Sequence, residues 1–407
     1  MASIPPPVRH PYLLPAVAMM LGWGLRGFIG GGPLGAMIPG AMVMASICHA
    51  HPRRCQLMLT AFAAIGVGFG GEMTYGQTVG FIVRAETFWW GFLGLALKGA
   101  IWGALAGAVI TLGLRPRPGL VTAASAVMLA ATAAGWKLIN EPKRIYFSNP
   151  ADKPREEIWA GLLFAAIALA AFLAWRGLGQ TAVRLAAACF VGGWIGFGFG
   201  GAIQGAGRIF LPQWNLHWWK YMEFFFGFCF GWALAWAWSK AMRFMEWESC
   251  ACDRPAPPAW KELAAAAAIA GMIFWMEAHL PLRFAYMVAG CLALLAVALA
   301  PWLARQVAFS VPFTAAALDL ARHWTRQHGG GAEIPSALAV LAGLLFAWRT
   351  RVLDFRLSKM LELLTWSSVA LATWKFAIHP DGIFNLLDHV AIGFLLMAAA
   401  LSWLLRR

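Results

Sequence analysis

The sequence predicts an all-α fold, a bundle of about 12 to 14 transmembrane helices with glycine-packed contacts and an internal repeat. Three observations favour this fold. Hydrophobic residues make up 61% of the 407 residues and charged residues only 12%, whereas a soluble domain carries about 25% charged residues. Apolar runs near the length of about 20 residues that crosses a bilayer follow one another along the chain. Glycine also recurs at every fourth position in three of these runs, as in closely packed membrane helices.

The apolar runs give the expected helices in chain order. Pro33 follows Gly30, Gly31 and Gly32, so the first two runs form either a tight hairpin or two half-helices. Lys and Arg are concentrated in alternate connections, which favours fourteen spans with both termini in the cytoplasm, although the first two runs and the run 307–322 leave the count open by two. We expect helices over 12–30, 33–50, 57–82, 88–112, 119–138, 158–175, 182–206, 217–241, 262–279, 284–304, 307–322, 333–348, 357–378 and 383–405.

Composition divides the chain into a glycine-rich transmembrane core over 1–245, a cytoplasmic linker over 246–261 and a second transmembrane bundle over 262–407. Within the core, the sequence Gly-Phe-Gly-Gly at 68–71 recurs at 198–201, and a Trp-Trp pair follows each copy about twenty residues later. Two repeats that run in the same direction are a feature of several transporter folds. Resemblance through shared glycine and tryptophan content alone is the alternative explanation.

Ionisable residues inside apolar runs are costly in a membrane, so they are usually paired or functional. Arg26 lies in the first glycine-rich passage and Glu72 in the second, and we expect these two to pair. Their alternative role is an ion pair that only joins helices, and Lys98 and Glu223 can instead extend toward an interface. Neutral polar residues beside close-packed backbone either orient a ligand or bond across helices. The predicted ligand-binding residues are Arg26, Glu72, Tyr75, Gln77, Lys98, Gln204 and Arg208.

Several functional classes are not expected. The net charge of +14 arises from basic residues in short connections between apolar runs, which argues against nucleic-acid binding. Arg53 and Arg54 lie beside the cysteines and histidines of 48–55, so no metal site is predicted there. The sequence contains no Walker A, GxSxG or HExxH motif, so no cofactor is predicted and any transport would be driven by a solute or ion gradient.

One motif carries a resemblance. The sequence Trp-Gly-Leu-Arg-Gly at 23–27, followed by Gly-Ala-Met-Ile-Pro-Gly-Ala at 35–41, resembles a group of polytopic bacterial inner-membrane proteins with a WGxRGxxG…GAMIPGA motif. Gly30–Gly32 stands where that group has a His-Glu pair, and the resemblance extends to about residue 240. It implies a multi-pass protein of the bacterial inner (cytoplasmic) membrane, and it implies no activity.

These observations favour a secondary transporter of a small polar or anionic solute through a mid-membrane site. Arg26 would contact the negative group of the solute, and Glu72 would pair with Arg26 or couple transport to protons. Besides the solute, the expected partner is the lipid bilayer, and homo- or hetero-oligomers remain open. A structural subunit of a membrane complex is one alternative. The other is a membrane-embedded transferase for a lipid-linked or envelope substrate, with outer-face residues Glu86, Lys137, Glu141 and Arg144.

Overall fold

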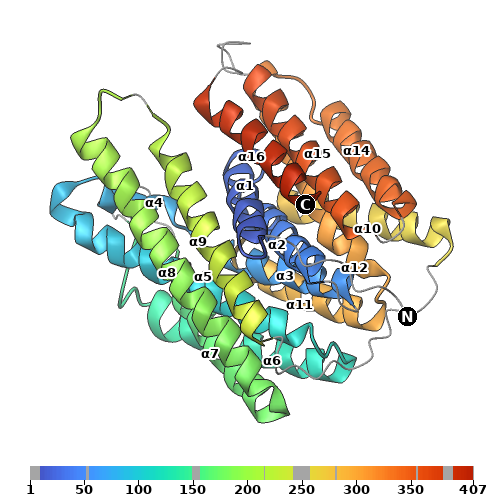
Figure 1. Cartoon of the computed structure of the whole chain (residues 1–407), viewed down its shortest axis with the longest axis horizontal. Helices are drawn as coiled ribbons and strands as arrows, with labels where there is room; N and C mark the ends of the chain where they lie inside the picture. Colours follow the sequence, from blue (N-terminus) through green and yellow to red (C-terminus); the bar gives the residue numbers. More distant parts are fainter. Residues whose placement is uncertain are drawn as a thin grey trace.

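The chain is an all-α bundle in which helices account for most of the described residues (Figure 1). The computed structural model describes residues 10–51, 55–148, 156–214, 216–241, 257–279, 282–353, 356–378 and 388–406, and none of these residues is in a strand. Each of the fourteen predicted apolar runs overlaps with a helix, although the run 57–82 is divided between the helices Gln56–Gly70 and Gly76–Ile82. Within the described ranges, four helical stretches are long and apolar enough to cross a membrane: Gly32–Ala50, Ala85–Leu112, Pro118–Asn140 and Trp159–Phe210.

Within the described residues, the N-terminal part of the chain folds into a series of helices. They are α1 (Leu13–Ile29), α2 (Gly32–Ala50), α3 (Gln56–Gly70), α4 (Gly76–Ile82), the short η1 (Ala85–Thr87), α5 (Phe88–Leu112), α6 (Pro118–Gly135), α7 (Trp159–Leu173), α8 (Gly179–Phe210) and α9 (Trp218–Ala241). The C-terminal part contains α10 (Ala259–His279), α11 (Leu282–Leu299), α12 (Leu303–Arg305), α13 (Val311–His328), α14 (Glu333–Val352), α15 (Leu357–Ala377) and α16 (His389–Leu405). Wider turns at Trp136–Asn140 and Gln306–Ser310 extend α6 and α13, and the turn Ala174–Leu178, where Gly177 has a φ of +79°, joins α7 to α8.

Glycine sets the separation of the central helices α5 and α8. A methyl group on Gly99 would overlap the carbonyl oxygen of Gly193, and a methyl group on Gly193 would overlap the carbonyl oxygen of Gly99. The two backbones therefore touch, as in other small-residue contacts between membrane helices. On another face of α8, Gly196 and Gly200 meet the backbone of α9. The predicted glycine face at 192, 196 and 200 is thus a helix-packing face.

The first two helices form the tight hairpin that was one of the two predicted arrangements. Helix α1 ends at Ile29, and α2 begins at Gly32 with Pro33 in its first turn, where the missing proline N–H is not needed. Gly32 has a φ of +74°, which favours glycine. A methyl group on Gly35 would overlap the carbonyl oxygen of Gly30, so only glycine allows this close return of the chain.

The predicted continuous helix over 57–82 is wrong, because the chain breaks after Gly70. A methyl group on Gly71 would lie 2.5 Å from the Cα of Pro33, so the start of α2 occupies the space beside this glycine pair. The segment Glu72–Tyr75 is not helical, and α4 begins at Gly76. Non-helical backbone is tolerated at membrane depth only where protein surrounds it. This break positions the side chains of the candidate site.

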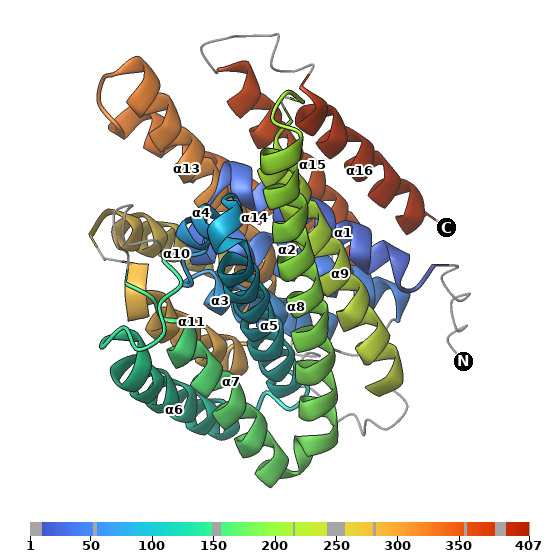
Figure 2. The same ribbon diagram turned by 90° about the vertical axis from the view of Figure 1, so that its left-hand side faces the viewer.

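The C-terminal helices pack against the first three helices. Helix α11 lies against α3, α13 and α15 lie against α2, and α16 lies against α1. Figure 2 shows α15 and α16 on the same side as α1. The part 246–256 of the predicted linker lies outside the described residues, and α10 begins inside the linker range at Ala259.

Candidate functional site

Arg26 lies in the last turn of α1 and is surrounded by aromatic rings. Its side chain is only 4% exposed. The guanidinium carbon lies 5.2 Å from the ring centre of Trp23, 5.3 Å from that of Tyr75 and 5.2 Å from that of Trp102. The negative faces of the three rings stabilise the buried positive charge.

A chain of hydrogen bonds leads from Arg26 to a buried carboxylate. Nη1 of Arg26 donates to the hydroxyl of Tyr75 at 2.8 Å, and this hydroxyl donates to Oε1 of Glu223 at 3.0 Å. Nε of Arg26 is buried and has no acceptor among the described residues. A buried donor without an acceptor costs about 1–3 kcal/mol, and more when the group is charged. The guanidinium is therefore held in place with hydrogen-bonding capacity left over.

Glu223 lies near the start of α9 and its side chain is fully buried. Its Oε1 accepts a second hydrogen bond from Nε1 of Trp219 at 2.8 Å, and its Oε2 pairs with Nζ of Lys220 at 2.6 Å. Lys220 also donates to the carbonyl oxygen of Gly24 in α1 at 3.2 Å. The cluster of Arg26, Tyr75, Glu223 and Lys220, here called the Arg26 cluster, contains two cationic side chains and one carboxylate.

The Arg26 cluster lies directly below exposed backbone. Gly27 is exposed, yet a methyl group on it would overlap the carboxylate of Glu223. Gly76, which follows Tyr75, is exposed as well, and a methyl group on it would lie 3.5 Å from the ring of Trp219. Two exposed glycines therefore lie next to the buried carboxylate and to Trp219, one of its hydrogen-bond donors.

Glu72 does not pair with Arg26, which corrects the sequence prediction. Its Oε1 accepts from the backbone N–H of Met287 in α11 at 2.8 Å, and its Oε2 is buried with no hydrogen-bond donor among the described residues. The physical reason is the break after Gly70, since Glu72 turns toward α11 whereas Tyr75 turns toward α1 and α9. Arg26 instead reaches a carboxylate through Tyr75, and that carboxylate is Glu223.

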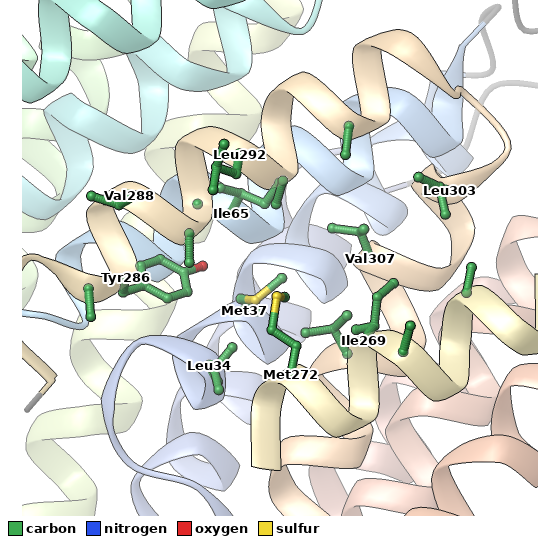
Figure 3. A pocket seen from close by; sticks show the side chains of 18 of the residues that line it. Leu34, Met37, Ile65, Ile269, Met272, Tyr286, Val288, Leu292, Leu303 and Val307 are labelled. Carbon is green, nitrogen blue, oxygen red and sulfur yellow. The ribbon is translucent and has the colours of Figure 1, made fainter. Parts of the chain in front are cut away.

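An apolar chamber lies on the Glu72 side of the break (Figure 3). Its volume is about 510 Å³, and its lining comes from α2, α3, α10, α11 and the chain from Leu303 to Val311. Tyr286 lines the chamber, and its buried hydroxyl lies against Gly68 of α3 with no hydrogen-bond partner among the described residues. Neither Arg26 nor Glu72 lines it. The chamber is therefore separate from the Arg26 cluster.

Lys98 has all three of its N–H groups matched by acceptors. It donates to the carbonyl oxygen of Thr74 at 2.6 Å, to the hydroxyl of Thr78 at 2.8 Å and to Glu157 at 2.8 Å. Glu157 accepts further hydrogen bonds from the backbone N–H of Phe147 at 2.9 Å and from another side chain. Lys98 therefore connects the non-helical segment Glu72–Tyr75 to α5 by a hydrogen bond. Lys98 is not a member of the Arg26 cluster.

The remaining predicted ligand-binding residues differ in their exposure to solvent. Gln204 is 1% exposed, and its Oε1 has no donor among the described residues. It lies two helical turns beyond Phe197, whose ring centre is 5.0 Å from that of Tyr75, so it occupies the same face of α8. Gln77 is half-buried in the first turn of α4, and Arg208 is exposed near the end of α8.

The residues proposed for the alternative outer-face site are exposed. Lys137 and Glu141 pair with each other at 2.6 Å, one turn apart on α6 and its extension. Glu86 and Arg144 are exposed as well. None of these four side chains lines the apolar chamber.

The predicted ligand set omitted Lys220 and Glu223, which complete the Arg26 cluster, and Trp219, which donates to Glu223. Their spacing of three and four residues along α9 places them on one helical face. This spacing was readable in the sequence, but the direction of the face was not. No family model, curated protein or solved structure matches this chain. The case for function therefore rests on the Arg26 cluster.

Proposed function

We propose that this chain is a secondary transporter of a small anionic solute, and that Arg26 binds the negative group of the solute. The observation that carries the proposal is the guanidinium of Arg26, which is buried, surrounded by three rings and left with an unmatched Nε donor. A planar guanidinium offers two parallel N–H groups that suit a carboxylate or a phosphate. An anion at Nε would supply the acceptor that the protein does not.

The charge of the cluster favours an anion. Arg26 and Lys220 carry two positive charges, and Glu223 carries one negative charge when ionised. Both cations are mostly buried, where electrostatic interactions are stronger than in water. A bound anion of one negative charge would balance the cluster.

The broken helices support transport over a purely structural role. Transporters bind solutes where membrane helices are interrupted, because the interruption leaves backbone N–H and C=O groups available to the solute and changes the direction of nearby side chains. Here the break at Glu72–Tyr75 brings Tyr75 between Arg26 and Glu223. A solute that competes for Nη1 of Arg26 would release the Tyr75 hydroxyl, which remains bonded to Glu223. This exchange would couple solute binding to movement of the segment.

The proposal includes the membrane arrangement. We place the protein in the bacterial inner membrane with fourteen spans and both termini in the cytoplasm, and we treat α3–α5 and α8–α9 as two copies of one repeat. The apolar helices and their lengths support a membrane location. Arg26 lies in the last turn of α1, so this orientation puts the site nearer the outer face than the middle of the bilayer.

Uptake by reconstituted vesicles tests the proposal. The panel contains phosphate, sulfate and short mono- and dicarboxylates, each offered to wild type, Arg26→Gln and the control Arg349→Gln. Arg349 is an exposed basic residue in the last turn of α14. We expect uptake of at least one anion by wild type and by Arg349→Gln, and at least a tenfold loss in Arg26→Gln, because the lost charged hydrogen bonds contribute about 1.5–3 kcal/mol. Equal uptake by all three proteins, or no uptake and no binding of any anion, would overturn the proposal.

A further inference from the structure

A long surface groove lies between α8 and α9, and its lining includes no residue of the Arg26 cluster. The two helices run side by side in both ribbon views (Figures 1 and 2). The groove has a volume of about 970 Å³. Its lining is apolar except for one basic residue from each helix. The lining residues are Arg184, Ala187, Ala188, Val191, Gly192, Ile195, Phe228, Cys229, Trp232, Ala233, Trp236, Ala237 and Lys240.

The two basic residues lie at the same end of the groove. Arg184 lies in the second turn of α8, and Lys240 lies in the last turn of α9. Because consecutive helices packed side by side run in opposite directions, the start of α8 and the end of α9 meet at one end. Both side chains are exposed, so a ligand at the surface can reach them.

The groove is about as long as one leaflet of a bilayer. On α8 it extends from Arg184 to Ile195, and on α9 from Phe228 to Lys240. At 1.5 Å per residue these stretches measure about 16–18 Å. The hydrocarbon core of a bilayer is about 30 Å thick, so one leaflet is about 15 Å. A lipid with its head at the basic end would reach the far end with one acyl chain.

Small residues form the floor of the groove and large residues form its walls. A methyl group on Gly192 would overlap the Cβ of Ala233, so α8 and α9 touch along the floor. Trp232 and Trp236 are 42% and 48% exposed and form one wall. This shape suits a flexible hydrocarbon chain, which needs close contact and no hydrogen bonds.

We propose that the α8–α9 groove binds an anionic phospholipid, with one acyl chain along the groove and the phosphate at Arg184 and Lys240. Basic pockets between transmembrane helices bind anionic headgroups in this way. A zwitterionic lipid would bring its own cation to the two basic residues and would be disfavoured. The proposal requires that the chain lies in a membrane, but it does not depend on transport.

Native mass spectrometry of the purified full chain tests this proposal. The protein is mixed with equal amounts of phosphatidylglycerol and phosphatidylcholine of the same acyl chains. We expect wild type to retain phosphatidylglycerol in preference, and Arg184→Gln/Lys240→Gln to lose at least tenfold of this retention, since each basic residue near a membrane surface contributes about fivefold. The matched control is Arg349→Gln/Arg406→Gln, which removes two exposed basic residues at the ends of α14 and α16 and should retain the lipid.

A second variant separates the acyl chain from the headgroup. Ala188→Phe fills the groove and leaves both charges in place, so it should also lose bound phosphatidylglycerol. If Ala188→Phe retained as much phosphatidylglycerol as wild type, the acyl chain would not lie in the groove. Equal retention of the two lipids by wild type, or unchanged retention in Arg184→Gln/Lys240→Gln, would overturn the proposal as a whole.

Discussion

Two buried cations, Lys98 and Arg26, donate hydrogen bonds to adjacent residues of the non-helical segment Glu72–Tyr75. They differ in how many of their N–H groups have a hydrogen-bond acceptor. Lys98 holds the carbonyl oxygen of Thr74, and each of its three N–H groups has an acceptor. Arg26 holds the hydroxyl of the next residue, Tyr75, but its Nε has no acceptor among the described residues. Both cations are almost fully buried, at 1% and 4% exposure.

We infer a structural role for Lys98 from this difference, and it is the basis for the proposed ligand-binding role of Arg26. A buried charge is tolerated when partners replace its lost hydration, and the Lys98 cluster provides those partners within the chain. In the Arg26 cluster, Nε of Arg26 has no acceptor among the described residues. An unpaired buried donor of this kind is consistent with a ligand-binding site. Burial of a charge alone would not have distinguished the two, because both residues are equally hidden from solvent.

The largest loss of stability is expected for Lys98→Met. Removing one partner of a buried ion pair leaves Glu157 uncompensated and costs about 3–5 kcal/mol. The measurement is the free energy of unfolding in detergent solution. The control is Lys359→Met, which removes an ion pair to Glu362 with a half-exposed lysine and should cost at most about 1 kcal/mol. A Lys98→Met protein as stable as wild type would mean that this cluster is not structural.

A smaller loss in the free energy of unfolding is expected for Tyr75→Phe. This change removes the hydroxyl between Arg26 and Glu223, and we expect a loss of about 1–3 kcal/mol because two buried groups each lose a partner. Anion binding should persist, since the guanidinium remains and gains a free Nη1. Binding that is abolished as fully as in Arg26→Gln would show that Tyr75 itself contacts the solute.

Compared with Lys98→Met and Tyr75→Phe, Arg26→Gln should change the free energy of unfolding less. The variant loses cation–π contacts of about 2 kcal/mol and the hydrogen bond to Tyr75, about 1–3 kcal/mol, but it also removes the desolvation cost of a poorly matched cation, which is several kcal/mol. We expect the two effects nearly to cancel in unfolding measurements without added anion. A destabilisation as large as that of Lys98→Met would place Arg26 among the structural charges.

The smallest effect is expected for Gln204→Leu. The buried amide oxygen of Gln204 has no donor among the described residues, so an apolar side chain of similar size should leave stability unchanged within about 1 kcal/mol. Uptake measured in parallel tests the predicted solute contact at this position. Loss of uptake with stability retained would extend the site from Arg26 along α8.

Most of the fold could be predicted because hydrophobic length and charged connections determine where membrane helices begin and end. The run 33–50 corresponds to α2 at Gly32–Ala50, for example. The break after α3 could not be predicted in the same way. The sequence Gly-Phe-Gly-Gly ends a helix at 68–71, where Pro33 and Trp102 crowd its glycines, yet it continues a helix at 198–201. The neighbouring helices decide between these outcomes, and local sequence does not encode them.

The site was predictable only in part for the same reason. Arg26 and Tyr75 were both in the predicted set, and the structure joins them by a hydrogen bond. Glu72 was the wrong carboxylate, since its direction depends on the break. Glu223, the carboxylate that completes the cluster, is 148 residues away from Tyr75, and only tertiary packing brings them together.

The most direct test of the Arg26 assignment is anion-dependent thermal stabilisation. A ligand that binds the folded state raises its stability by RT ln(1 + [L]/Kd), so unfolding of wild type, Lys359→Met and Arg26→Gln can be followed against increasing concentrations of each anion in the panel. We expect at least one anion to raise the unfolding temperature of wild type and Lys359→Met and to leave that of Arg26→Gln unchanged. An equal rise in all three proteins would contradict it.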